Sequence, residues 1–249
     1  MKYLIVLLFL LTCCNKVEDT LTLEEMAKID SKTGSYIYPV ERGEQKLFEL
    51  GFDKYYDTCI IPTNILHHLT SEGLIASCLN YPPYFNIFYF DNYQDGFDRI
   101  VSKSNVFTEL FSRKDVASRL ISKYNNQVVD PFVVDNYVQK GTFTIIYLEI
   151  LLSQEQSINQ MSFQMKDKVI KEVLQKIDYR NTVLKEQLFS SVISSLILGR
   201  VLKSMQYSNF IAALKQDQNL SAFLKKGTYY DTISTSKIII FSQEYIKNK

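Results

Sequence analysis

Residues 97–124, FDRIVSKSNVFTELFSRKDVASRLISKY, decide the fold class of this chain. Apolar side chains recur there at steps of three and four residues, and Ser, Arg and Lys occupy the opposite side. Three stripes follow one another: Phe97, Ile100 and Val101; then Val106, Phe107, Leu110 and Phe111; then Val116, Ala117, Leu120, Ile121 and Tyr124. Because this spacing matches the 3.6-residue helical turn, it predicts three consecutive amphipathic helices.

The same helical spacing extends in both directions from this block. Before it, residues 44–50 end at Gly51, a typical helix stop, and residues 65–79 end before two prolines. After it, residues 143–152 (FTIIYLEILL) fit either a buried strand or a helix, and their helical neighbours favour a helix. Residues 188–205 form the most apolar helical segment, which we expect to be a central core helix.

This succession of helices predicts an all-α fold, either a helical bundle or an irregular α-α superhelix of stacked helix pairs. No repeat of fixed period is legible, although a helical repeat stays possible in the superhelix alternative. The 46% hydrophobic content is typical of a globular protein, and 8 Gly and 5 Pro argue against a turn-rich β fold. We expect residues 36–249 to form a single α-helical domain.

The N-terminus predicts export and a lipid anchor. Met1-Lys2 is a short positive region, and residues 3–11 (YLIVLLFLL) form an apolar stretch too short to span a bilayer as a helix. The sequence Leu11-Thr12-Cys13-Cys14 that follows resembles a bacterial lipoprotein signal. The resemblance implies a signal peptide over residues 1–13 and acylation of Cys14, with Cys13 as the less favoured site. Residues 14–35 are then an acylated Cys and a tether.

A second resemblance concerns residues 66–125. The stretches 70–74 (TSEGL), 79–82 (LNYP) and 109–115 (ELFSRKD), together with Gly96-Phe97 and Asn105, resemble a helical group of predicted Bacteroidetes exported proteins of unassigned function. This resemblance implies an exported helical protein. Together with the lipoprotein signal, it implies a lipid-anchored protein of the bacterial cell envelope, in the outer membrane and facing either the periplasm or the surface. It implies no catalytic residue.

The net charge and the absence of known catalytic motifs argue against several classes of function. Lys and Arg total 28 and Asp and Glu total 27, a formal net charge of +1, which argues against a nucleic-acid partner. The chain has two adjacent histidines, His67 and His68, and no phosphate-binding loop, zinc-peptidase motif or nucleophile elbow. No cofactor and no metal site is therefore predicted, and a non-enzymatic protein is favoured. Cys59 and Cys78 are either buried free thiols or a disulfide.

The run 81–90 (YPPYFNIFYF) is the most unusual feature of the sequence. Six of its ten residues are aromatic, and its prolines interrupt regular helix. The aromatic residues either form a binding surface for a protein or a glycan, or fold back to plug one end of the helical array. The absence of Trp from the chain argues against a sugar-stacking surface. The candidate binding residues are Tyr81, Tyr84, Phe85, Phe88 and Tyr89.

Three acidic residues form a second candidate site. Asp91, Asp95 and Asp98 are separated by four and three residues, so on a helix they share one face and could perform acid–base chemistry. The favoured alternative is structural, with Asp91 as the helix N-cap and the other acids stabilised by the helix dipole.

Three functional hypotheses follow from these observations. The first is a lipid-anchored envelope protein that presents a helical surface to a protein or a glycan. The second is a hydrolase that uses the acidic cluster. The third is a structural subunit of an outer-membrane assembly.

Overall fold

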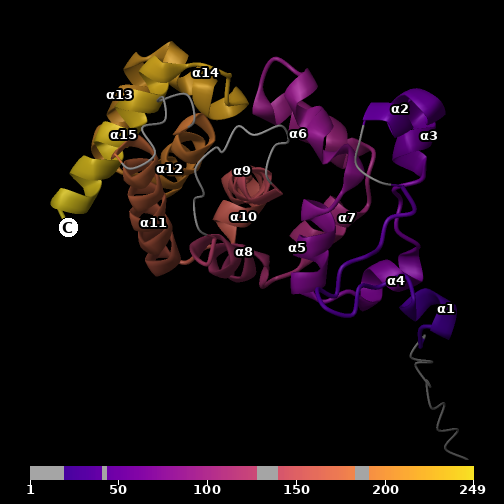
Figure 1. The fold of residues 1–249 in the computed structure, drawn as a ribbon. Helices are drawn as coiled ribbons and strands as arrows, with labels where there is room; N and C mark the ends of the chain where they lie inside the picture. The colour runs from indigo at the N-terminus through magenta and orange to yellow at the C-terminus, as the bar shows by residue number, and fades with distance from the viewer. Residues whose placement is uncertain (1–19, 41–43, 128–139, 183–190) are drawn as a thin grey trace, which may run out of the picture.

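Figure 1 shows the chain in a computed structural model, which describes residues 20–40, 44–127, 140–182 and 191–249. These residues contain fifteen α-helices and one 3₁₀-helix, and β pairing among them is limited to two isolated bridges. The prediction of an all-α fold is confirmed. The helices are α1 (Leu23–Met26), α2 (Glu44–Leu50), α3 (Phe52–Asp57), α4 (Thr63–His68), α5 (Ser71–Leu79), η1 (Pro82–Tyr89), α6 (Tyr93–Ser102), α7 (Val106–Ser112), α8 (Val116–Asn125), α9 (Lys140–Ser153), α10 (Glu155–Asn159), α11 (Phe163–Thr182), α12 (Val192–Ser204), α13 (Ser208–Gln216), α14 (Gln218–Lys226) and α15 (Thr232–Lys247).

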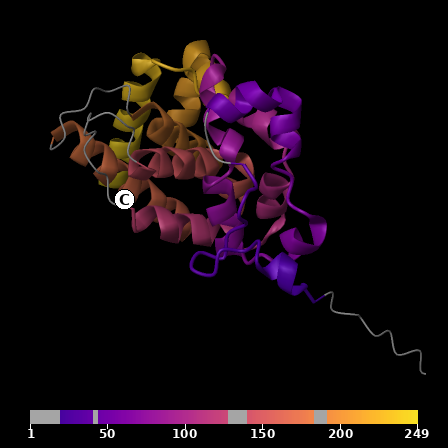
Figure 2. The ribbon, with the colours of Figure 1, turned by 45° about the vertical axis from the view of Figure 1, so that its right-hand side comes forward.

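Two apolar helices hold this arrangement together. α9 packs against α5, α8, α10 and α12, and α12 packs in addition against α11, α14 and α15. In Figure 1 the indigo and magenta helices α1–α7 gather on one side, the orange and yellow helices α11–α15 on the other, and α8–α10 lie between them. The turned view in Figure 2 keeps this division. Because α9 and α12 contact helices far apart in sequence, the architecture is a bundle.

The core confirms the helical assignment of the ambiguous run 143–152 and the expected central core helix. The run 143–152 lies within α9 and is helical, and residues 192–202 of α12 are all buried. α11 carries several lysines, and one of them is buried. Lys176 is 8% exposed, donates to Gln127 O at 2.8 Å and pairs with Glu172 at 3.0 Å. The segment around Asp130 that suits a helix start lies outside the described residues.

A polar cluster is buried inside the bundle between α8, α9, α11 and α12. Glu149 Oε1 accepts hydrogen bonds from Tyr124 Oη at 2.8 Å, Arg180 Nη2 at 2.9 Å and Ser194 Oγ at 2.8 Å. Arg180 Nη1 also donates to Ser194 Oγ at 2.7 Å. Glu149 is 1% exposed and Arg180 4%. The charges of Glu149 and Arg180 therefore neutralise each other within the core, and the hydroxyls of Tyr124 and Ser194 complete the hydrogen bonds of the carboxylate.

The N-terminal segment is described from residue 20 onward, so the signal segment and both candidate acylation sites lie outside the described part. α1 begins with a capping box between Thr22 and Glu25. Beyond α1, Ile29 forms a bridge with Tyr36, and Ser35 and Tyr36 are buried. The last residues of the expected tether thus pack against the domain. Across the described residues, no helix is long and apolar enough to cross a membrane.

Cys59 and Cys78 are buried free thiols, so the disulfide alternative is wrong. Burial raises the pKa of Cys59 to about 12 and holds the pKa of Cys78 well above its usual range. Both side chains belong to the apolar core near the aromatic residues of η1.

We expect neither thiol to react with iodoacetamide in the folded protein at pH 8. The thiolate is the nucleophile, and at a pKa of about 12 only about one thiol in ten thousand is ionised at that pH. A chain that begins at residue 15 carries only these two cysteines, so mass spectrometry should count no adduct on the folded chain and two in guanidinium. Rapid labelling of the folded chain would contradict the buried placement.

Candidate functional site

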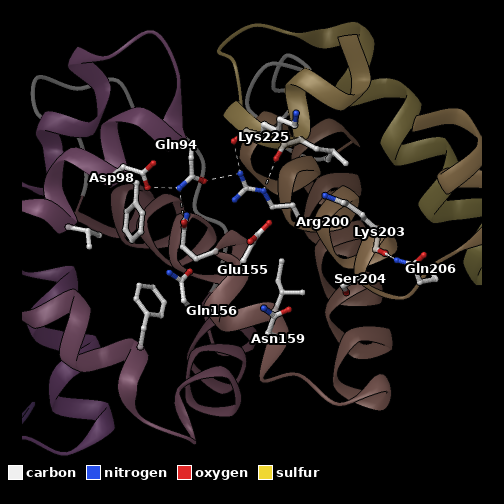
Figure 3. Close-up of a pocket in the computed structure, with 16 residues that line it drawn as sticks. Gln94, Asp98, Glu155, Gln156, Asn159, Arg200, Lys203, Ser204, Gln206 and Lys225 are labelled. Carbon is white, nitrogen blue, oxygen red and sulfur yellow. Dashed lines mark hydrogen bonds between the residues drawn. The ribbon is translucent and has the colours of Figure 1, made fainter. Parts of the chain in front are cut away.

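A cavity of about 520 Å³ lies between α6, α10, α12 and α14, with one residue of α7 at its edge (Figure 3). This volume falls in the range of small-molecule sites. Its wall carries side-chain amides, two carboxylates, three cations and an apolar part. The lining residues are Gln94, Phe97, Asp98, Val101, Phe111, Gln154, Glu155, Gln156, Ile158, Asn159, Arg200, Lys203, Ser204, Gln206, Leu224 and Lys225.

Helical periodicity places these side chains. Gln94, Phe97, Asp98 and Val101 of α6 recur at steps of three, one and three residues and therefore share one face. Asn92 begins this helix, because its side chain accepts from the N–H of Asp95. On α12, Arg200, Lys203 and Ser204 likewise share a face, and α10 supplies the opposite wall.

Arg200 is the most buried charge at the cavity, at 9% exposed. Its Nε donates to Leu224 O at 2.9 Å, its Nη1 to Ser153 O at 2.9 Å, and its Nη2 to Gln94 Oε1 at 2.8 Å and Lys225 O at 3.1 Å. The guanidinium is therefore held in a fixed orientation by neutral oxygens. Burial lowers the pKa of Arg200 to about 10, and the carboxylates of Glu155 and Asp98 act in the opposite direction.

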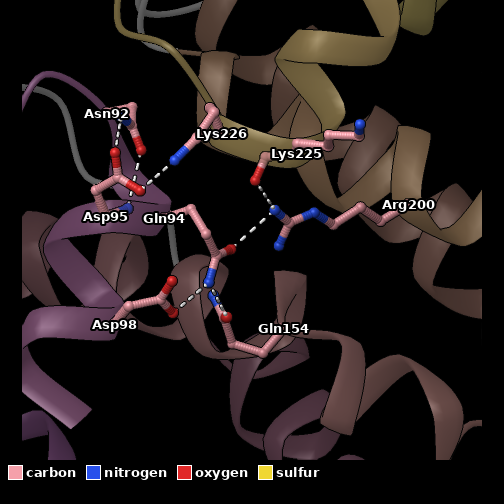
Figure 4. Close-up of polar contacts among 8 residues, drawn as sticks. All are labelled: Asn92, Gln94, Asp95, Asp98, Gln154, Arg200, Lys225 and Lys226. Atoms are coloured by element: carbon pink, nitrogen blue, oxygen red, sulfur yellow. Dashed lines mark hydrogen bonds and ion pairs between the residues drawn. The ribbon is translucent and has the colours of Figure 1, made fainter. Parts of the chain in front are cut away.

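Gln94 connects the two sides of the cavity (Figure 4). Its Nε2 donates to Asp98 Oδ1 at 2.8 Å and to Gln154 Oε1 at 3.1 Å, while its Oε1 accepts from Arg200. Figure 3 shows the Glu155 carboxylate pointing toward the same space from α10. A ligand in the cavity would thus meet acceptors and donors that are already oriented.

The structure separates the three acids of the predicted cluster. Asp91 is exposed and is not the N-cap of α6 (Tyr93–Ser102), because Asn92 occupies the N-cap position. Asp95 pairs with Lys226 at 2.5 Å, and hydrogen bonds from Lys226 and Asn92 lower its pKa. Only Asp98 lines the cavity, so the acidic site built from all three residues is not assembled. Within the described residues, no group of three His, Cys, Asp or Glu side chains is placed to hold a metal ion.

The aromatic run forms the 3₁₀-helix η1, with prolines in its first turn. Tyr81 and Tyr84 are fully buried, so their assignment as binding residues is wrong: they fill the core. Phe85 and Phe88 are half-buried, and Tyr89 is 50% exposed. The plug alternative therefore accounts for the inner residues of the run.

Both histidines lie in the last turn of α4. His68 Nδ1 lies 2.7 Å from Asn64 O, and His67 Nδ1 lies 3.6 Å from Glu109. Neither lines the cavity.

Sequence reasoning missed the residues that build the cavity, Arg200 and Gln94 above all. The available signal was Arg200 itself, a charge inside the most apolar helical segment. Comparison with known proteins adds no assignment: no protein-family model, no curated protein and no solved structure matches this chain.

Proposed function

We propose that this chain is a lipid-anchored protein of the bacterial cell envelope that binds a saccharide without transforming it, and that the cavity is its binding site. The observation that carries the proposal is the wall of the cavity, which places amides, carboxylates and a fixed guanidinium beside apolar side chains.

A saccharide fits this wall because each hydroxyl both donates and accepts hydrogen bonds. The carboxylates of Asp98 and Glu155 accept from hydroxyls, Lys203 donates to them, and the amides of Gln156 and Asn159 do both. The apolar part, which includes Phe111, matches the C–H face of a sugar ring.

Other small ligands fit this wall less well. A purely apolar ligand would strip water from these polar groups without replacing their hydrogen bonds, which costs about 1–3 kcal/mol for each group left unpaired. A polyanion would be repelled by Asp98 and Glu155. A neutral or singly charged polyhydroxyl ligand avoids both penalties.

Gln156 and Asn159 provide the test, because both are exposed at the cavity and replacing them leaves the core intact. On an oligosaccharide array the chain from residue 15 onward, which contains every described residue, should bind specific saccharides. Gln156→Ala and Asn159→Ala should each weaken that binding by up to about tenfold, the value of one hydrogen bond. Gln175→Ala, exposed on α11, is the matched control.

Failure of every saccharide to bind, or binding that is unaffected by both variants, would overturn the proposal. Release of shortened saccharides during the assay would favour the hydrolase alternative. In that case Asp98 and Glu155 are its acids, because they are the carboxylates of the cavity wall.

The lipid anchor is tested separately. We expect Cys14→Ser to abolish incorporation of labelled fatty acid and to move the protein from the detergent phase to the aqueous phase. Lipidation at this site adds buried CH₂ groups that each contribute about 0.8 kcal/mol to membrane binding. Retention of the label in Cys14→Ser and its loss in Cys13→Ser would move the site by one residue.

A further inference from the structure

We propose that the saccharide bound in the cavity is acidic, and that its carboxylate binds Arg200. This inference rests on the proposed function and names the ligand class of the same site.

Three cations are buried among the described residues: Lys176, Arg180 and Arg200. Arg180 is paired with Glu149 at 2.9 Å, and Lys176 with Glu172 at 3.0 Å. Arg200 is buried to a similar degree, yet among the described residues no carboxylate lies within ion-pair distance of it. Buried charges in proteins are normally paired, because removing a charge from water without a counter-ion is costly. An anionic ligand would supply the counter-ion that Arg200 lacks among the described residues.

The hydrogen-bonding capacity of Arg200 also favours a ligand at this position. A guanidinium has five N–H groups, and those of Arg200 make four hydrogen bonds to protein oxygens. One N–H on Nη1 remains for a ligand. The bonds to Leu224 O, Ser153 O and Lys225 O hold the group at the cavity wall, so binding requires no reorientation. A fixed, charged donor favours a carboxylate oxygen.

The charges around Arg200 also favour a ligand with one anionic group. Lys203 and Lys225 line the cavity beside Arg200, and both are exposed. Figure 3 shows these three cations on one side of the cavity, Asp98 on the other, and the Glu155 carboxylate between Asp98 and Lys203. This asymmetry suits a ligand with one anionic group and several hydroxyls, with the carboxylate toward Arg200 and hydroxyls toward Asp98 and Glu155.

The test changes the ligand rather than Arg200, because Arg200 also supports the fold. Oligosaccharides ending in glucuronate, galacturonate or N-acetylneuraminate are compared by calorimetry with their methyl esters, which keep every hydroxyl and lose the charge. Neutral glucose and galactose oligosaccharides and sodium acetate complete the panel. We expect at least one acid to bind and its ester to bind at least tenfold more weakly, since hydrogen bonds to charged groups contribute about 1.5–3 kcal/mol.

Each other outcome has a defined meaning. If the esters bind as tightly as the acids, or if only neutral oligosaccharides bind, the proposal of an acidic ligand is overturned. The proposed function, saccharide binding in the cavity, is then unaffected. Acetate that binds as tightly as the acidic saccharides overturns saccharide recognition. No binding across the panel and the array overturns both proposals.

Two lysine variants test whether the cations beside Arg200 contribute to binding of the acidic saccharide. We expect Lys203→Gln and Lys225→Gln each to lower the affinity for the acidic saccharide by about two- to fivefold, the range of an exposed ion pair. The affinity for the methyl ester should stay unchanged. Lys215→Gln on α13, exposed and outside the cavity, is the control. Equal weakening of acid and ester by the first two variants would contradict a charge-specific role.

Discussion

Replacing Arg180 with Met is expected to lower the free energy of unfolding by about 3–5 kcal/mol, because it leaves a buried carboxylate without its counter-ion. Glu149 is 1% exposed, and its Oε1 would keep only the hydroxyl donors Tyr124 and Ser194. Small domains have total stabilities of about 5–15 kcal/mol, so this loss is large.

Urea unfolding followed by circular dichroism measures the effect. Lys171→Met, exposed on the same helix, is the control and should change the stability by about 0.5 kcal/mol or less. The double variant Glu149→Leu with Arg180→Met removes both charges and should recover part of the loss, since apolar replacement of a buried pair is often tolerated. A loss below about 1 kcal/mol in Arg180→Met alone would contradict a tightly packed ion pair.

The helices around residues 97–124 could be predicted from the sequence because their signal is local. The three apolar stripes correspond to α6 (Tyr93–Ser102), α7 (Val106–Ser112) and α8 (Val116–Asn125). Each stripe lies on one helix, so the 3.6-residue period alone identifies it. The apolar run of α9 needed the context of its neighbours, because a helix without a polar face does not reveal its period.

The cavity could not be predicted in the same way, because it depends on contacts between distant residues. Gln94 and Arg200 are 106 positions apart, and Asp95 and Lys226 are 131 apart. The spacing of Asp95 and Asp98 correctly places both on one helix, but Asp91 precedes that helix, and the spacing does not reveal that a lysine of α14 engages Asp95. One buried arginine within an apolar segment was the only local sign of the site.

The sequence of the aromatic run 81–90 likewise does not reveal which of its rings are buried in the fold. Tyr84→Ala should lower the free energy of unfolding by about 3–5 kcal/mol, because it removes a fully buried ring and leaves a cavity. The Tyr84 ring stacks on Tyr147 with centroids 4.1 Å apart, packs edge-on against Phe107, and its hydroxyl donates to Tyr147 O at 3.1 Å.

Tyr89→Ala is the matched control from the same 3₁₀-helix. Tyr89 is half exposed and its ring meets Phe85 at 6.0 Å, so its loss should cost about 1 kcal/mol. The melting temperature and the free energy of unfolding should therefore be much lower for Tyr84→Ala than for Tyr89→Ala, although both variants remove a tyrosine from one run of aromatic residues. Equal stability of the two variants would mean that Tyr84 lies at the surface, and the run would again be a candidate binding surface. A large difference assigns the inner face of the run to the core, which leaves only its outer residues accessible to a partner.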